Sequence, residues 1–304
     1  MYNLIVNPID VQNMWNTLGM TEILNYLIQS GQFNVSHHKE KLNACRTERS
    51  CTLYLDGKKI FFDLWDYSNP TFTYEVFKAN YDLILKLQFR KMTWEQIEKE
   101  RKDNNMFPNL SSTDLKSFFD KIVPWTFFCS RMMKKLIGKE DQIPQIPIER
   151  IGFFCGKDWR TRRAMKAKLQ KEGIEYLYSD QETNKKPLSE EDFLHRMMSS
   201  KYGIVIHGRG GVFCEAKNRR EIDYMMLKKP LLLNYKPSYY NPMTEGKHYI
   251  YIDPNTDFKN LENMYNIQEI ASNGYQWYKE NASPEGVVKT FLQIINDKLK
   301  GETK

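Results

Sequence analysis

A glycine-rich corner that contains a histidine and an arginine lies in the second half of the chain. The apolar run at residues 204–206 ends in His207, Gly208, Arg209, Gly210 and Gly211. Glycines in such a turn let backbone N–H groups approach an anion closely, and the start of a following helix adds a favourable dipole. The corner is therefore predicted to bind phosphate, although a plain turn at the two last glycines would use the same residues.

Acidic and basic side chains follow this corner. A helix is predicted over residues 214–228, and it would place Glu215 and Asp223, eight positions apart, on one face. Carboxylates accept hydrogen bonds from hydroxyl groups, whereas arginines bind phosphate. Arg220 lies between these acids, and Arg160 follows an earlier apolar run. A nucleotide that carries a sugar needs both kinds of contact.

The overall charge favours a phosphorylated small molecule over a polymeric nucleic acid. The chain of 304 residues has 45 basic and 38 acidic residues, which gives a net charge of +7. Nucleic-acid-binding proteins usually gather their charge on one face. Here the basic residues are spread out, apart from small clusters at residues 160–163 and 219–220. Arg162 and Arg163 would equally suit a solvated helix face.

Several other chemistries lack their motifs. The chain has no P-loop, no G-x-G-x-x-G after a strand, no H-E-x-x-H, no paired C-x-x-C and no Asp-x-Asp. We therefore expect neither a metal nor a cofactor. The N-terminus lacks the pattern of a secretory signal, and no apolar run approaches the roughly 18 residues of a membrane span. These features predict a cytoplasmic protein without a membrane span.

The second half alternates between strand and helix signals. Strands are predicted at residues 151–156, 174–179, 202–208 and 230–235, with helices at 158–173, 188–201 and 214–228 between them. Two helices follow in the tail. This alternation predicts a parallel sheet with helices on both faces, and ligands bind such sheets beyond the carboxyl ends of the strands. Arg160 and the glycine-rich corner would lie at that edge.

The first half has a different pattern. Asp56 and Gly57 separate two strand-like runs and predict a hairpin. Further predictions are a strand over residues 82–88, helices within residues 11–30 and from Met92, and a helix-like apolar stretch within residues 116–137. A polar segment at residues 138–147 contains two prolines and is predicted as a linker. It would separate a domain of residues 1–140 from one of residues 148–304, with the last helix able to return to the first domain.

The second half resembles the donor-binding domain of GT-B-type glycosyltransferases over roughly residues 148–290. Many of these carry Glu, seven residues, a second Glu, and then Ala-Met-x-x-Gly-x-Pro. Here Glu215 matches the first acid, Asp223 takes the place of the second, and Lys228 replaces the glycine, while Met225 and Pro230 keep the register. Residues 151–163, 218–232 and 245–253 also resemble exostosin-like and CAP10-like transferases, including those of large DNA viruses.

This resemblance implies an α/β fold with two Rossmann-like domains facing a cleft. It also implies inverting, metal-independent transfer of a sugar from a UDP-sugar, with UDP-xylose as the specific suggestion, to a glycan hydroxyl. A viral protein would act in the host cytoplasm. The diphosphate would lie near the glycine-rich corner with Arg160 and Arg209, while Glu215 or Asp223 would hold hydroxyls, a role that Glu221 could also take.

The acceptor would bind in the N-terminal domain. Its hydroxyl has a high pKa, so inversion needs a general base. Asp66 and Asp63, which follow a predicted strand, are the candidates, with Asp66 first. Two alternatives stay open: a nucleotide-sugar-binding or saccharide-binding protein without catalysis, and a protein that binds RNA or another nucleic acid.

Overall fold

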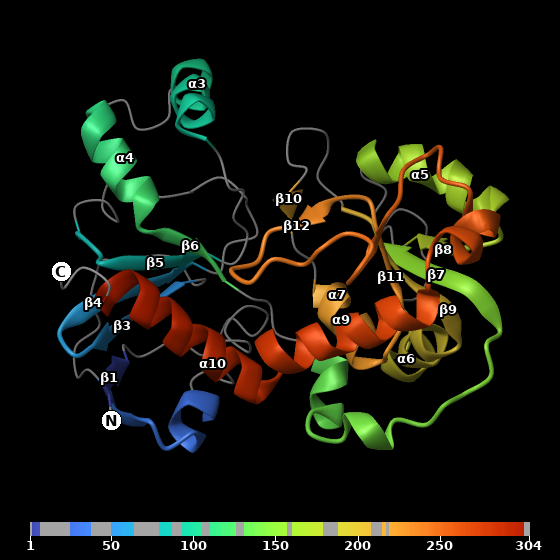
Figure 1. Ribbon diagram of the computed structural model, residues 1–304, viewed down its shortest axis with the longest axis horizontal. Coiled ribbons are helices and arrows are strands. Elements are labelled where there is room, and N and C mark those ends of the chain that lie inside the picture. Colours follow the sequence, from blue (N-terminus) through green and yellow to red (C-terminus); the bar gives the residue numbers. More distant parts are fainter. Residues whose placement is uncertain are drawn as a thin grey trace. The chain divides into compact units, whose positions relative to one another are not determined.

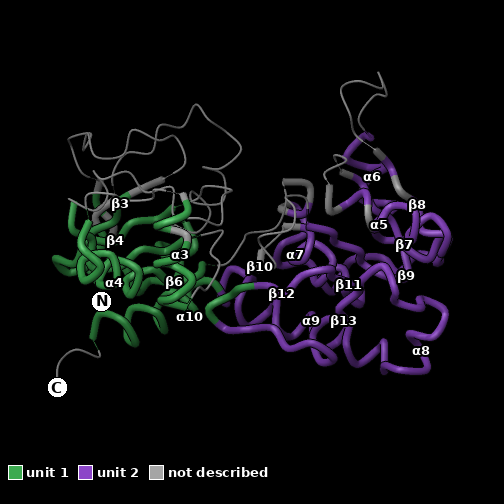
Figure 2. The backbone as a smooth tube through the Cα atoms, turned by 90° about the horizontal axis from the view of Figure 1, so that it is seen from above, with its two compact units in different colours: residues 1–126, 238–240, 287–304 green, residues 127–237, 241–286 purple. Residues whose placement is uncertain are grey.

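The computed structural model of the protein describes residues 2–6, 25–37, 50–63, 79–86, 93–104, 110–125, 131–156, 160–178, 188–207, 215–216 and 219–300. The chain forms two compact units (Figure 2). Unit 1 consists of residues 1–126, 238–240 and 287–304, and unit 2 of residues 127–237 and 241–286. Both units combine helices with a sheet that contains parallel strands, so the predicted α/β class is confirmed. The segment at 138–147 belongs to unit 2.

Unit 1 contains a six-stranded mixed sheet in the order β2-β1-β3-β4-β5-β6. Its strands are β1 (Tyr2–Val6), β2 (Phe33–His37), β3 (Ser50–Leu55), β4 (Lys58–Asp63), β5 (Leu83–Lys86) and β6 (Ile122–Pro124). Only β3 runs antiparallel to its neighbours, so the other five strands end at the same edge. The predicted hairpin joins β3 to β4. Its turn residues, Asp56 and Gly57, have φ values of 47° and 82°, as a tight two-residue turn requires.

The central strand β4 is buried on both faces. Phe61 joins an apolar cluster with helices α3 (Trp94–Asn104) and α4 (Ser112–Asp120). The next residue, Phe62, points to the opposite face, as alternation along a strand requires. It contacts Trp125 edge-on, with ring centroids 5.6 Å apart, and Phe291 of α10 (Pro284–Ile295), 6.0 Å away. The C-terminal helix thus covers one face of this sheet (Figure 1).

The helix-like stretch predicted within residues 116–137 is only partly helical. The Ser111 hydroxyl caps α4 by accepting a hydrogen bond from the Asp114 backbone N–H at 3.1 Å, and α4 ends at Asp120. The chain then forms β6, where Ile122 pairs with Ile84 of β5. Its residues Ile122 and Val123 are β-branched and buried, which favours a strand over a continued helix. Residues 131–136 form a 3₁₀ helix.

Unit 2 contains a parallel five-stranded sheet in the order β13-β11-β9-β7-β8. Its strands are β7 (Arg150–Gly156), β8 (Glu175–Tyr178), β9 (Ser200–Val205), β11 (Leu231–Leu233) and β13 (Ile250–Tyr251). Helices α5 (Arg160–Lys171), α6 (Glu190–Met198) and α7 (Arg219–Met226) connect the first four in turn. The chain passes from β7 to β8 and then returns beyond β7 to β9. The direction of winding therefore reverses between β7 and β9.

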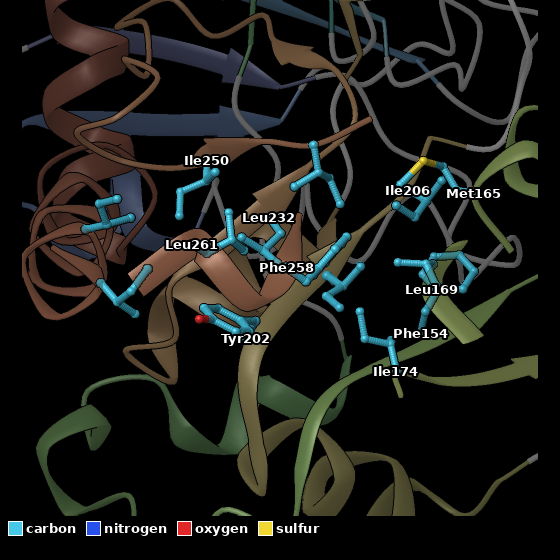
Figure 3. Packing of buried hydrophobic residues seen from close by; sticks show 14 residues of the cluster. Phe154, Met165, Leu169, Ile174, Tyr202, Ile206, Leu232, Ile250, Phe258 and Leu261 are labelled. Carbon is cyan, nitrogen blue, oxygen red and sulfur yellow. The ribbon is translucent and has the colours of Figure 1, made fainter. Parts of the chain in front are cut away.

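Strand β9 shows how the helices divide between the two faces of this sheet. Ile204 and Ile206 belong to a cluster with Met165 of α5 and with residues of β11 and β13 (Figure 3). On the opposite face, Gly203 lies against Tyr224 of α7, because a Cβ atom at Gly203 would be only 2.4 Å from Tyr224 Cγ. The glycine lets α7 approach the strand closely. Helix α5 thus packs on one face and α7 on the other.

The remaining elements complete unit 2 and the C-terminus. They are the 3₁₀ helices η2 (Glu140–Gln142) and η4 (Phe258–Asn260), the short strands β10 (Glu215–Ala216) and β12 (Lys236–Pro237), the helices α8 (Leu261–Met264) and α9 (Ile267–Asn281), and a final turn, Asn296–Lys300. The Ser189 cap predicted for α6 is present, and its hydroxyl accepts from the Asp192 N–H at 3.0 Å. Within the described part of the chain, no helix is long and apolar enough to cross a membrane.

Candidate functional site

The edge where β7 and β9 end is the first place to look for a ligand. In doubly wound sheets the loops diverge at the reversal of winding, which leaves room for a ligand beyond the carboxyl ends of the strands. Arg160 is the first residue of α5, directly after β7, and His207 follows β9. Both therefore lie at this edge, as predicted. Residues 208–211 and the side chain of Arg160 are outside the described part of the structure.

Two arginines from different helices converge on one aromatic ring at this edge. The guanidinium carbon of Arg162, on α5, is 5.2 Å from the centroid of the Phe154 ring. That of Arg220, on α7, is 5.7 Å from the same centroid and 5.6 Å from that of Phe193. Arg162 is only 9% exposed, and its Nε donates a hydrogen bond to the carbonyl oxygen of Ile206 at 3.2 Å. Arginines from α5 and α7 therefore both contact the side chain of Phe154 on β7.

These positive charges affect the pKa of the Cys155 thiol, which follows Phe154 on β7. Burial raises the pKa of Cys155, and the positive charges of Arg220, Arg162 and Arg196 oppose that rise. Arg196 also forms an ion pair with Glu175. The end of β7 is thus a region of positive potential. An anion at this strand end would meet positive charge contributed by both α5 and α7.

A second group of side chains lies at the ends of β9 and β11. The backbone N–H of His207 donates to Asn234 Oδ1 at 2.8 Å. The His207 ring meets the Tyr235 ring edge-on, with centroids 5.6 Å apart and an interplanar angle of 63°. The Tyr235 hydroxyl donates a hydrogen bond to the carboxylate of Glu221 on α7. Glu221 is 0% exposed and Tyr235 only 2%, so this hydrogen bond is inside the protein.

Glu215 and Asp223, the two acids predicted to bind hydroxyl groups, do not lie on the same helix. Glu215 lies on β10, which pairs in parallel with β12, and α7 begins only at Arg219. The prediction that Glu215 and Asp223 lie on one helix face is therefore wrong. The backbone pairing of β10 with the segment after β11 prevents a helix from starting at residue 214. Asp223 does lie on α7 and is 0% exposed, whereas the side chain of Glu215 is outside the described part.

Unit 1 has its own charged pair at the end of its sheet. Asp63 is the last residue of β4 and Lys86 the last of β5, and the two are register partners. Lys86 Nζ is 2.7 Å from Asp63 Oδ2, and the two side chains are 0% and 2% exposed. Asp63, a candidate base, is thus engaged in a buried ion pair. Asp66, the other candidate, is outside the described part.

The sequence pattern does not single out three residues of these groups. Arg162 suits a solvated helix face as well as a site, and no motif predicts a role for Lys86 or Tyr235. Lys86 is a cation that ends an apolar strand beside a strand ending in an acid, which is a usable signal. Arg162 and Tyr235 gave no such signal, since their partners come from distant segments.

No protein-family model matches the sequence, and the curated proteins contain no significant match. The part of the structure described also contains no group of three or more His, Cys, Asp and Glu side chains placed to hold a metal ion. Function is therefore inferred from the residues and their geometry, which favour a site for a phosphorylated ligand at the reversal of winding in unit 2.

Proposed function

We propose that the protein is a glycosyltransferase that binds a nucleoside diphosphate sugar at the β7–β9 edge of unit 2 and transfers the sugar to a glycan hydroxyl. The observation that carries this proposal is the convergence of Arg162 and Arg220 on the Phe154 ring. A diphosphate carries the negative charge that guanidinium groups at this strand end would attract. Arginine presents its N–H groups in a planar fork that matches phosphate oxygens.

The same arginines would assist the chemical step. When the bond between the sugar and the diphosphate breaks, negative charge builds up on the leaving diphosphate. Cations held in place by the fold stabilise that charge without rearrangement, which is the largest single effect in many enzymes. Arg162 is held by its hydrogen bond to Ile206 and by its contact with Phe154, so it is already in position.

The sugar-transfer part of the proposal rests on the resemblance around residues 215–230. One feature of the structure supports the alignment of that pattern. Lys228, which stands where the family pattern has glycine, has a φ of 53°. This left-handed conformation is one that glycine adopts most readily. Its occurrence in a lysine indicates that the fold requires this backbone conformation at position 228.

The finer details remain predictions from the resemblance. They are the preference for a UDP-sugar, the suggestion of UDP-xylose, the inversion at the sugar carbon, and two Rossmann-like domains facing a cleft. For the base, Asp66 stays ahead of Asp63, because the carboxylate of Asp63 is engaged by Lys86 inside unit 1. We propose Asp66 as the group that takes the acceptor proton.

Ligand-dependent stability tests the binding step. The melting temperature would be measured with UDP, GDP, CMP, pyrophosphate and uridine, each over a range of concentrations. A ligand at 100 times its Kd stabilises the folded state by about 2.7 kcal/mol. We expect a rise with UDP, a smaller one with pyrophosphate, and little with uridine, which lacks phosphate. A rise with uridine equal to that with UDP, or no rise with any diphosphate at millimolar concentration, would contradict the proposal.

Turnover separates an enzyme from a protein that only binds. UDP release from UDP-sugars would be followed with a pool of glycan acceptors, for the wild type and for Asp66→Asn. We expect acceptor-dependent release that the substitution abolishes, while UDP binding stays unchanged. Binding of UDP-sugars without release under any acceptor would support the alternative, a nucleotide-sugar-binding protein without catalysis.

A further inference from the structure

We infer that Asn234, Tyr235 and Glu221 are positioning residues that hold His207 for contact with the diphosphate of the bound donor. This inference rests on the proposed function, because it assigns a role within the same site. His207 is only half-buried and stands at the start of the glycine-rich corner. Its imidazole N–H is a hydrogen-bond donor of the kind that a phosphate oxygen accepts.

The backbone of His207 is fixed by the neighbouring strand. Val205 of β9 and Leu233 of β11 are register partners, so the residues that follow them leave the sheet side by side. There the His207 N–H donates to Asn234 Oδ1 at 2.8 Å. This bond joins the two chain segments just beyond the sheet and holds the backbone of His207.

The ring of His207 is oriented by Tyr235. The edge-on contact at 5.6 Å is a favourable geometry for two aromatic rings, so it stabilises this orientation of the imidazole. Tyr235 is itself held, since its ring is buried and its hydroxyl donates to Glu221. Rotation of Tyr235 would leave a fully buried carboxylate without this donor, which is costly. Glu221 therefore acts on His207 through Tyr235.

A second tyrosine–glutamate pair in unit 2 supplies a matched comparison. The Tyr278 hydroxyl of α9 donates to Glu140 Oε1 of η2 at 2.8 Å, and both residues are buried. Removal of either tyrosine hydroxyl has the same chemical consequence, because a buried carboxylate loses one hydrogen-bond donor. Only removal of the Tyr235 hydroxyl should disturb the histidine.

The test compares Tyr235→Phe with Tyr278→Phe in the full chain. UDP affinity would be measured by calorimetry, and the His207 ring signals by NMR, assigned with His207→Gln. We expect the wild type to show a His207 signal shifted by the Tyr235 ring. Tyr235→Phe should move that signal and weaken UDP binding at least fivefold, whereas Tyr278→Phe should lower the melting temperature comparably and change neither readout.

The outcomes separate this inference from the proposed function. If the wild type binds no diphosphate, the proposed function and the positioning role are both overturned. If it binds UDP and Tyr235→Phe binds equally well with an unmoved His207 signal, the positioning role alone is overturned. Equal losses of affinity in both variants would overturn it too, because they would indicate a general loss of structure. Should Tyr235→Phe fail to fold, Asn234→Ala takes its place, and the same shift of the His207 signal and loss of affinity are expected.

Discussion

Replacement of Arg220 by alanine tests the arginine pair directly. Arg220 lies on α7, is half-buried, and reaches both the Phe154 and the Phe193 rings. It is better suited to substitution than Arg162, whose Nε is hydrogen-bonded to Ile206 inside the sheet edge. If the diphosphate lies between the two guanidinium groups, Arg220→Ala removes one of its charged donors and leaves the other.

The expected loss of UDP affinity follows from the charged hydrogen bond that Arg220→Ala would remove. A hydrogen bond to a charged group contributes about 1.5–3 kcal/mol, so UDP binding should weaken about 10- to 150-fold. The loss should shrink as salt is added, because exposed charges are screened. Each ring contact of a partly exposed arginine is worth about 0.5–1 kcal/mol, so the free energy of unfolding should fall by about 1–2 kcal/mol.

Calorimetry with UDP at two salt concentrations measures the affinity, and denaturant unfolding measures the stability. Lys171→Ala is the control, because it removes a positive charge from the other end of α5. We expect the control to bind UDP as the wild type does. A Kd for Arg220→Ala within twofold of wild type, with the fold intact, would refute the placement of the diphosphate. An equal loss in Lys171→Ala would show that only the net charge matters.

Three further sets of substitutions test the packing, the backbone and the buried ion pair. Phe291→Ala, at a site that is 0% exposed, should lower the stability of unit 1 by about 3–5 kcal/mol in denaturant unfolding, and a loss below 1 kcal/mol would exclude Phe291 as a core residue. Lys228→Gly should be more stable than Lys228→Ala by about 1 kcal/mol, because only glycine adopts the positive φ freely; equal stability would contradict this. Asp63→Leu and Lys86→Met should each cost about 3–5 kcal/mol, while the double variant regains most of it; additive losses would show that the pair is not coupled.

Much of the fold follows from local patterns in the sequence. Apolar runs predict β7, β9 and β11, and the Asp56-Gly57 turn predicts the hairpin of unit 1. Strand β6 is not predicted, because its apolar residues Ile122 and Val123 follow closely on Phe118 and Phe119 of α4. A short apolar stretch of this kind has no change of period that marks where the helix ends and the strand begins.

The candidate site could be predicted only in part, because some of its contacts depend on the order of the strands in the sheet. The position of the corner after β9 depends on the chain order, which the sequence shows. The proximity of Arg162 to Arg220 depends on the strand order, which sets β7 beside β9 although β8 lies between them in the chain. The contact of Tyr235 with Glu221 likewise depends on how α7 packs against β11. Side chains on separate elements carry no local signal of such proximity.

Burial decides which acidic residues of unit 2 could bind the hydroxyl groups of a sugar or ribose. Glu221 accepts a hydrogen bond from Tyr235 inside unit 2, and Asp223 is also 0% exposed, so neither presents a carboxylate to a ligand in this structure. Glu215 is therefore the remaining candidate for binding these hydroxyl groups. Its strand pairs with β12, where Glu215 is the register partner of Lys236, the residue after Tyr235. The segment 234–237 therefore fixes both His207 and the backbone of Glu215, and we propose that it aligns the phosphate and hydroxyl contacts of the donor.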